Sequence, residues 1–255
     1  MSEQASYNDV ALLFSGGLDS TLAATVLAQN YDRVHLVSVS RGYGHTKVGR
    51  TSRRFEELRA RLDPNKFDHV ILSAKDLFRR AILRTLVHDV VKYKGLFVIC
   101  VGCKLVMHTI GAIYCLERGI PNIADGASGA TGWMSDQTEE ALQGYRQLHA
   151  ALGLRYSNPV VQITNRQDER DRLKELGFST GRKVAGRDLG TQPVCLYGDL
   201  LTFLREAIFK VSLPVSDKAI GSYLAEKMPL LWEHVRGHFQ PGGKDASEKD
   251  DHVSE

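Results

Sequence analysis

The chain has 255 residues, of which 43% are hydrophobic and 25% are charged, and its formal net charge is +3. These values are typical of an ordinary soluble globular protein and argue against a dedicated nucleic-acid binder. The first five residues are too polar for a signal peptide, and no run approaches the length of a membrane span, so we expect a cytoplasmic protein.

Short apolar runs predict strands at 10–14, 34–39, 69–72 and 122–124, and longer stretches between them predict helices at 20–29, 48–62 and 101–118. This alternation is typical of an α/β fold in which a parallel, twisted sheet carries helices on both faces. Ligands of such sheets bind at the carboxyl ends of the strands. We therefore expect segments 15–20, 40–47 and 125–132 to line one site.

The second half of the chain reads as mainly helical. We expect helices at 136–152, 166–176, 199–210 and 216–235, with a long loop from Ser179 to Pro193. Thr164 or Asn165 caps the second of these helices, and Gly177 ends it. Three regions are predicted: an α/β domain over 1–160, a smaller mainly helical region over 161–237, and a disordered tail over 238–255.

The run Ser15-Gly16-Gly17-Leu18-Asp19-Ser20 lies between a predicted strand and a predicted helix. Backbone N–H groups of such a turn, together with the helix N-terminus, bind anions. Its glycines admit phosphate oxygens close to the main chain. The Gly-Lys-Ser/Thr ending of a Walker A loop is absent from this run.

Instead, the run resembles the Ser-Gly-Gly-x-Asp-Ser signature of the PP-loop ATP pyrophosphatases. The resemblance implies an adenine nucleotide alpha hydrolase-like fold and an enzyme that cleaves ATP between the α and β phosphates, forming AMP and pyrophosphate. It implies ATP and Mg²⁺ as cofactors. Their predicted ligands are Ser15, Gly16, Gly17, Asp19 and Ser20 around the pyrophosphate, Ser38, Val39 and Ser40 beside the adenosine, and Gly126 where the nucleotide meets the backbone.

Four cysteines are present, at 100, 103, 115 and 195. Cys100 and Cys103 begin a predicted helix, where the helix N-terminus is expected to lower thiol pKa values and make thiolates available. Such a pair suits redox chemistry, zinc or an iron–sulfur cluster. Cys195 lies 92 positions after Cys103. Cys115 lies on an apolar helix and reads as a buried core residue.

The cysteines extend the resemblance to PP-loop sulfur transferases with three cysteines, namely the nickel-pincer cofactor sulfur transferases and the tRNA 2-thiouridine synthetases. It is carried by Cys100-x-x-Cys103-Lys104, Arg118-Gly119-Ile120, Ala124-Asp125-Gly126, Glu175-Leu176-Gly177-Phe178-Ser179-Thr180, Lys183 and Cys195. It implies that Cys100, Cys103 and Cys195 hold a [4Fe–4S] cluster, whose fourth iron is open to hydrosulfide. They join Asp19 and Lys104 as catalytic residues.

Further expectations follow from this resemblance. The acceptor is a small molecule or a nucleotide, with tRNA as one candidate. Sulfide or a sulfur-donor protein supplies the sulfur, and the chain forms a homodimer. After Asp125-Gly126 the chain departs from both families, since neither the His-Asn-x-x-Asp-Asp element nor the Asp-Gly-Thr-Asn element is present.

Two other functions stay open. One is an adenylating ligase or amidotransferase of the 7-cyano-7-deazaguanine synthase type with cysteine-bound zinc, because Tyr43-Gly44-His45 resembles its Tyr-Gly-Gln element. The other is a regulatory nucleotide- or metal-binding protein without turnover. Three features each allow two interpretations. A phosphate could be bound by Arg41, His45, Lys47 and Arg50, or these residues could form a solvated basic face. Trp133 stacks on a base or packs in the core, and Lys183 binds a phosphate or is solvated.

Overall fold

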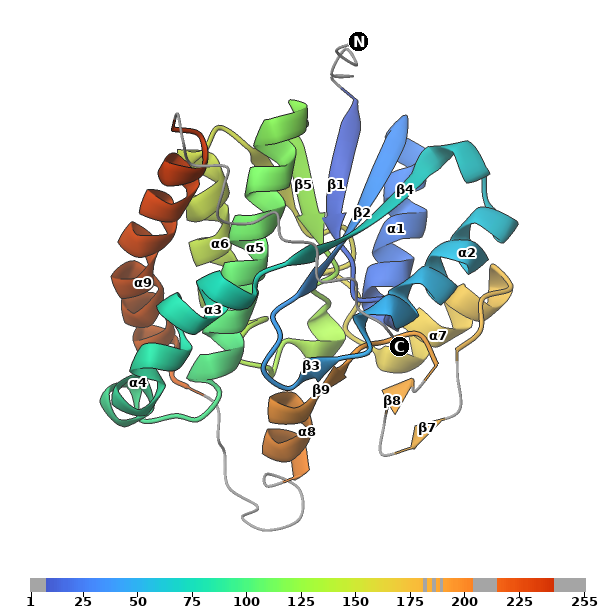
Figure 1. Cartoon of the computed structure of the whole chain (residues 1–255). Coiled ribbons are helices and arrows are strands. Elements are labelled where there is room, and N and C mark those ends of the chain that lie inside the picture. Colours follow the sequence, from blue (N-terminus) through green and yellow to red (C-terminus); the bar gives the residue numbers. More distant parts are fainter. Residues whose placement is uncertain (1–7, 181–182, 185–186, 189, 204–214, 241–255) are drawn as a thin grey trace.

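The computed structural model describes residues 8–180, 183–184, 187–188, 190–203 and 215–240. A central sheet of five strands is covered by helices on both faces (Figure 1). The strands lie in the order β4-β2-β1-β5-β6, and every neighbouring pair is parallel. The α/β class with a parallel sheet is therefore confirmed. The strand bounds are β1 Asp9–Leu13, β2 Arg33–Ser40, β4 Phe67–Ser73, β5 Asn122–Asp125 and β6 Arg155–Ser157.

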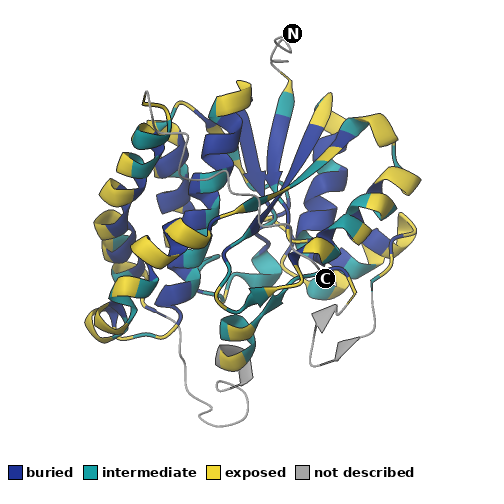
Figure 2. Ribbon diagram, in the orientation of Figure 1, coloured by how far each residue is buried: buried dark blue, intermediate teal, exposed yellow. Residues whose placement is uncertain are grey.

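The apolar strand runs arise because the sheet is buried on both faces. Val10 and Leu12 of β1 pack into one core cluster, and Ala11 between them packs into the other. The inner surfaces of the helices are buried and their outer surfaces are exposed (Figure 2). One face carries α1 Leu18–Asn30, α2 Thr51–Arg61 and α7 Arg166–Glu175, and the other carries α3 Lys75–Ala81, α5 Val98–Arg118, α6 Glu139–Ala151 and α9 Asp217–His238.

The chain order places the switch point of the sheet between β1 and β5. From β1 the chain builds β2 and β4 on one side, and it then crosses through α5 to build β5 and β6 on the other side of β1. The loops after β1 and β5 therefore diverge, and ligands bind at such a switch point. The loop after β1 is the PP-loop, residues 15–20, and the loop after β5 holds Gly126.

A short antiparallel pair brings the third cysteine to the same edge. β3, His45–Thr46, follows β2, and β9, Val194–Cys195, pairs with it so that Cys195 lies opposite His45. A second small hairpin joins β7, Lys183–Val184, to β8, Arg187–Asp188, within the predicted long loop.

Several predicted bounds differ from the structure. Helix 48–62 is divided into a 3₁₀ turn, Val48–Arg50, and α2. Helix α6 starts three residues after 136, because the hydroxyl of Thr138 accepts the N–H of Ala141 at 3.3 Å and caps it there. Helix α7 begins after Asn165 as predicted, and Gly177 follows its end with φ +78°. Elements that the sequence did not predict include β6, the short strands β3, β7, β8 and β9, and the helices α3 and α4, Leu86–Tyr93.

Two further predictions lie at the edge of the described residues. Helix α8 covers Leu196–Phe203 where 199–210 was expected, and residues 204–210 lie outside the described part of the chain. Helix α9 extends to His238, beyond the expected residue 235. Residues 241–255 of the predicted tail are not among the described residues.

Helix α5 corrects one expectation from the sequence. Its 21 residues are long and apolar enough to cross a membrane, although no such run was expected. However, 72% of its most apolar window is buried inside the protein. The helix is apolar because it packs against the sheet and against α3, α4, α6 and α9.

Candidate active site

The PP-loop forms a compact cup at the end of β1. Gly16 adopts φ +69°, a conformation that favours glycine, and Gly17 is the N-cap of α1. The hydroxyl oxygens of Ser15 and Ser20 lie 3.1 Å apart, and the hydroxyl of Thr21 donates to the Gly17 carbonyl at 2.6 Å. The predicted phosphate ligands thus lie together, at a helix N-terminus whose N–H groups favour an anion.

Asp19 of this loop is paired with a residue that the sequence analysis missed. The guanidinium of Arg166, at the start of α7, donates to the Asp19 carboxylate and, at 2.7 Å, to Glu169. The carboxylate of Asp19 is therefore neutralised in this structure. A Mg²⁺ ion bound there would share Asp19 with Arg166, and the Mg²⁺ site remains a prediction.

The residues predicted beside the nucleotide differ in their exposure. Ser38 is buried, and its hydroxyl donates to the Phe14 carbonyl at 2.8 Å. Val39 is in the core, and Ser40 is half-buried at the end of β2. A Cβ on Gly126 would lie 2.7 Å from the backbone N of Ser20. The end of β5 therefore packs directly on the start of α1.

The three predicted cluster ligands lie within electrostatic range of one cation. The charges of Cys195 and Arg41 both influence the pKa values of Cys100 and Cys103, so these side chains are near one another. Arg41 is 2% exposed and donates to the sulfur of Cys195 at 2.9 Å. The rings of Phe78 and Tyr197 each lie 4.9 Å from its guanidinium carbon. We call Cys100, Cys103 and Cys195 the cysteine site.

The expected lowering of the thiol pKa values is wrong for the metal-free protein. Burial raises the pKa of Cys103 to about 12 and that of Cys100 well above its ordinary value. Removing the thiols from water outweighs the helix N-terminus and Arg41. Metal binding would therefore have to displace protons from these thiols. Cys115 is fully buried on α5, as predicted.

A single zinc ion sets a limit on the distances between its sulfur ligands. A single zinc ion with Zn–S bonds of about 2.3 Å needs sulfur atoms within about 4 Å of one another. Among the described residues, the group with ligand atoms all within 4.8 Å is His88, Asp89 and Glu226, and the cysteine site does not form such a group. The described side chains of the cysteine site therefore do not form a ready site for one zinc ion.

The group His88, Asp89 and Glu226 is itself held by lysines. Lys227 lies 2.7 Å from the Asp89 carboxylate, and Lys92 pairs with Glu226. Their charges are thus compensated within the protein, and we assign no metal there.

A buried polar chain connects the cysteine helix to the end of β5. The ammonium of Lys104 lies 2.9 Å and the Nε2 atom of His108 lies 3.2 Å from the Asp125 carboxylate. Burial alone would raise the pKa of Asp125, but Lys104 and His108 hold it well below its ordinary range. His108 continues the chain to His149 through a 2.9 Å hydrogen bond. Lys104 thus pairs with Asp125 in this structure, and its catalytic role remains a prediction.

Two further charged residues at the site gave no signal in the sequence. Arg54 is completely buried beside the PP-loop, and its guanidinium lies 3.5 Å from the Gly16 carbonyl. Asp136 acts on the pKa values of both Cys100 and Cys103, and burial raises its own pKa. Its Oδ1 atom is buried without a hydrogen-bond partner among the described residues.

The remaining predicted residues are dispersed. Burial lowers the pKa of His45 to about 4, while Lys47 is exposed and Arg50 is half-buried. Trp133 is 49% exposed, so its reading as a core residue is wrong. Lys183 is in β7, and its side chain is outside the described part of the structure.

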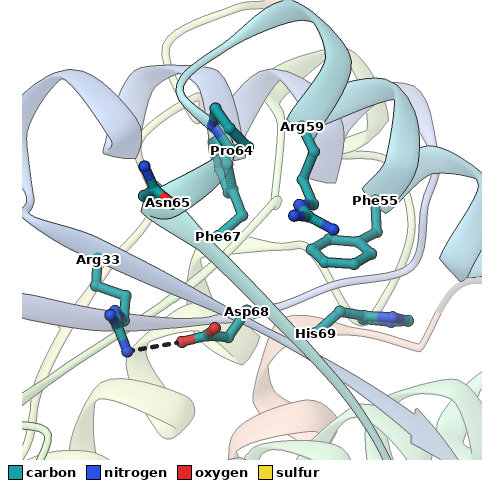
Figure 3. A pocket seen from close by; sticks show the side chains of 8 residues that line it. All are labelled: Arg33, Phe55, Arg59, Pro64, Asn65, Phe67, Asp68 and His69. Carbon is teal, nitrogen blue, oxygen red and sulfur yellow. Dashed lines mark ion pairs between the residues drawn. The ribbon is translucent and has the colours of Figure 1, made fainter.

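A cavity of about 450 Å³ lies elsewhere, beside the edge strand β4 (Figure 3). Its walls come from α2, the turn before β4 and the first residues of β2 and β4, and they include the Arg33–Asp68 ion pair at 3.3 Å. Because those residues begin their strands, the cavity does not lie at the carboxyl edge that holds the predicted site.

The family model of the queuosine biosynthesis protein QueC matches residues 9–177. None of the curated proteins matches the chain in sequence. Among solved structures, the chain is similar to a predicted subunit of a tRNA methyltransferase from Methanocaldococcus jannaschii, with 17% identity, coverage of 83% of this chain and 91% of the other, and a TM-score of 0.49.

Two other solved structures are similar to the chain. One is the U34-tRNA thiolase NcsA from Methanococcus maripaludis with its [4Fe–4S] cluster, with 15% identity, coverage of 88% and 72%, and a TM-score of 0.42. The other is a 4-thiouridine synthetase in complex with RNA and bound ATP, with 13% identity, coverage of 87% and 53%, and a TM-score of 0.47.

The QueC model spans more than half of the chain, and the matched residues include the whole sheet, the PP-loop and the Cys100–Cys103 pair. The structure adds a five-stranded parallel sheet with the PP-loop at its switch point and a mainly helical C-terminal part. The chain therefore belongs to the QueC family of PP-loop ATP pyrophosphatases, ATP-using enzymes of the adenine nucleotide alpha hydrolase-like fold.

Proposed function

We propose that this enzyme is an ATP-dependent sulfur transferase that adenylates a substrate oxygen and replaces that oxygen with sulfur. The observation that carries the proposal is the cysteine site, where three thiols and Arg41 meet beside the switch point of the sheet.

The chain's own residues have separate roles in the two steps. In the first step a substrate oxygen attacks the α phosphorus of ATP, the bond to the bridging oxygen breaks, and pyrophosphate leaves. The PP-loop and the N-terminus of α1 bind the polyphosphate, and the neighbouring guanidinium of Arg166 stabilises the charge of the leaving group. In the second step a sulfur nucleophile attacks the activated carbon, and AMP leaves with the original oxygen.

The cysteine site would hold a [4Fe–4S] cluster through Cys100, Cys103 and Cys195. When bound, the cluster would supply one iron without a protein ligand, at which the sulfur donor has access. Arg41, buried against Cys195, offsets the negative charge of the thiolates. The acceptor class, with tRNA as a candidate, the sulfide or protein donor, the homodimer and the cytoplasmic location belong to the same proposal.

One observation favours a second candidate, the zinc-containing ligase of the 7-cyano-7-deazaguanine synthase type. The matching family model is that of the queuosine biosynthesis protein QueC, and Tyr43-Gly44-His45 resembles the Tyr-Gly-Gln element of 7-cyano-7-deazaguanine synthase. The described residues of the cysteine site do not bring their three sulfur atoms within 4.8 Å of one another, whereas one zinc ion would need them within about 4 Å.

Metal analysis of protein purified without oxygen separates the two candidates. We expect about four irons and four sulfides per chain, lost in Cys100→Ala, Cys103→Ala and Cys195→Ala. Cys115→Ala is the matched control, since Cys115 lies on the same helix as the pair but outside the cysteine site. One zinc per chain without iron would support the ligase instead.

Pyrophosphate release tests whether the protein turns over at all. With ATP and a candidate acceptor, we expect pyrophosphate and AMP in equal amounts. Nucleotide binding without pyrophosphate release by the metal-loaded protein, for any nucleotide-type acceptor, would support a regulatory protein.

A further inference from the structure

The PP-loop is covered by a segment that comes about 175 positions later in the sequence. We call residues 190–195 the strap segment, which ends at Cys195. The backbone carbonyl of Thr191 lies so close to the loop that a Cβ on Gly16 would be 2.4 Å from it. The hydroxyl of Thr191 donates to the Gly16 carbonyl at 2.7 Å, and Thr191 is 5% exposed. This contact joins residues that are 175 positions apart in sequence.

Arg54 fixes the strap segment to the loop. Its guanidinium donates to the Thr191 hydroxyl at 3.3 Å and to the Ser179 carbonyl at 2.8 Å, while it also reaches the Gly16 carbonyl. A fully buried arginine that touches both segments holds them in a defined relative position. Glu57 pairs with it and compensates its charge.

This anchor places the side-chain amide of Gln192 over the PP-loop. A Cβ on Gly17 would lie 1.7 Å from its Nε2 atom and 2.8 Å from its Cδ atom. The amide therefore lies against Gly17, which leaves the loop open to phosphate because glycine has no Cβ atom. Among the residues that the structure describes, no hydrogen bond of the Gln192 amide is found. An N–H donor in this position complements a phosphate oxygen.

We propose that the strap segment is part of the nucleotide site and that the Gln192 amide donates a hydrogen bond to the polyphosphate of bound ATP. The Thr191–Arg54 contact positions this amide. Because the strap segment ends at Cys195, the residue that binds phosphate and the third thiol are held by one anchored stretch of six residues. The inference depends on ATP use by the family, and not on sulfur transfer or on any metal.

The test is binding of Mg²⁺–pyrophosphate, Mg²⁺–ATP and AMP to the full-length metal-free protein by calorimetry. We expect Gln192→Ala to weaken pyrophosphate and ATP about tenfold, as for loss of one hydrogen bond to a charged group, and to change AMP binding less than twofold. Gln192→Glu should weaken pyrophosphate further, because its carboxylate repels the anion. Gln162→Ala, at an exposed glutamine whose amide donates to Pro159, is the matched control and should bind all three ligands normally.

If the Gln192→Ala variant binds pyrophosphate and ATP with the affinity of the wild-type protein, the proposal is wrong. An equal loss for AMP would also overturn it, because that pattern indicates a general disturbance of the site. Gln192→Asn adds a check on folding, since it keeps the amide on a shorter side chain and should recover part of the lost pyrophosphate affinity. Failure of the metal analysis would leave this result unaffected.

Discussion

At the scale of single residues, the Lys104–Asp125 pair is a buried charge pair. Asp125 is 2% exposed, and the side chain of Lys104 is 16% exposed. Removing one partner of such a pair leaves an uncompensated buried charge, so we expect Lys104→Met to lower the free energy of unfolding by about 3–5 kcal/mol.

Urea denaturation measures this loss. Lys92→Met is the control, because the Lys92–Glu226 side chains are 46% and 37% exposed and surface pairs contribute little to stability. Equal losses of unfolding free energy in the two variants would show that the Lys104–Asp125 pair contributes no more to stability than a surface pair.

A second prediction at this scale concerns Gly126. A Cβ there would lie 2.7 Å from two backbone atoms of Ser20, so the PP-loop must move to admit it. We expect Gly126→Ala to weaken ATP binding at least tenfold and to cost about 1–3 kcal/mol of stability. Gly237→Ala adds a Cβ with nothing within 4 Å, and it should leave ATP binding unchanged in the same calorimetric titration. Normal ATP affinity in Gly126→Ala would show that this contact does not position the loop.

At the scale of elements, α6 and α9 pack against each other at a glycine. A Cβ on Gly144 of α6 would lie 2.4 Å from the Cδ1 atom of Leu224 on α9. We expect Gly144→Ala to cost about 1–3 kcal/mol by overpacking and Leu224→Ala to cost about 2–5 kcal/mol by leaving a cavity.

The double variant tests whether the two effects share one space. Its cost should be smaller than the sum of the single costs by about 0.5–3 kcal/mol, because the new methyl group enters the space that Leu224 leaves. Val87→Ala, at an 80% exposed position, serves as a surface control and should change stability by about 0.5 kcal/mol or less. Strict additivity of Gly144→Ala and Leu224→Ala would contradict the packing argument.

At the scale of the whole molecule, two fully buried histidines make stability depend on pH. Burial is the main cause that lowers the pKa values of His108 and His149. Both stay neutral in the folded protein and take up a proton when it unfolds below a pH of about 6.5. Stability is therefore complete above that pH and falls as the pH decreases toward the folded-state pKa values, by at most about 1.4 kcal/mol per pH unit for each histidine.

Urea denaturation between pH 8 and pH 5 measures this dependence. His149→Gln should reduce its slope, whereas His88→Gln, at a side chain that is 67% exposed, should not. Asp125 has a lowered pKa, so its contribution is lost only below its ordinary value of 3.8. Constant stability from pH 8 to pH 5 would contradict the neutral burial of both histidines.

The sequence predicted those parts of the molecule that have a local signal. The strands at 10–14 and 34–39 are apolar because both faces of the sheet are buried, and the glycine turn between strand and helix marks the PP-loop. Strand β6 has three residues, none of them fully buried, and thus left no apolar run to detect.

The charged residues of the site could not be predicted in this way. Arg54 meets Ser179 and Thr191 more than 120 residues later, and Arg166 meets Asp19 across 147 residues. The thiol pKa values were misjudged because the position of Cys100 and Cys103 at the start of a helix is visible in the sequence, whereas their burial depends on packing from other elements.

The attachment of the strap segment to the PP-loop has a consequence for synthesis on the ribosome. All five strands of the sheet, the PP-loop and Cys100–Cys103 lie before residue 158, and roughly 35 residues then separate the sheet from Gln192. At a translation rate of about 5–20 residues per second, about 2–7 s pass between the emergence of β6 and that of Gln192 from the ribosome. In that interval Arg54 has Glu57 as its nearby partner, while its bonds to Ser179 and Thr191 wait for the later chain. Nascent chains that have exposed the sheet but not yet residues 190–192 should thus carry a formed sheet but an incomplete ATP site.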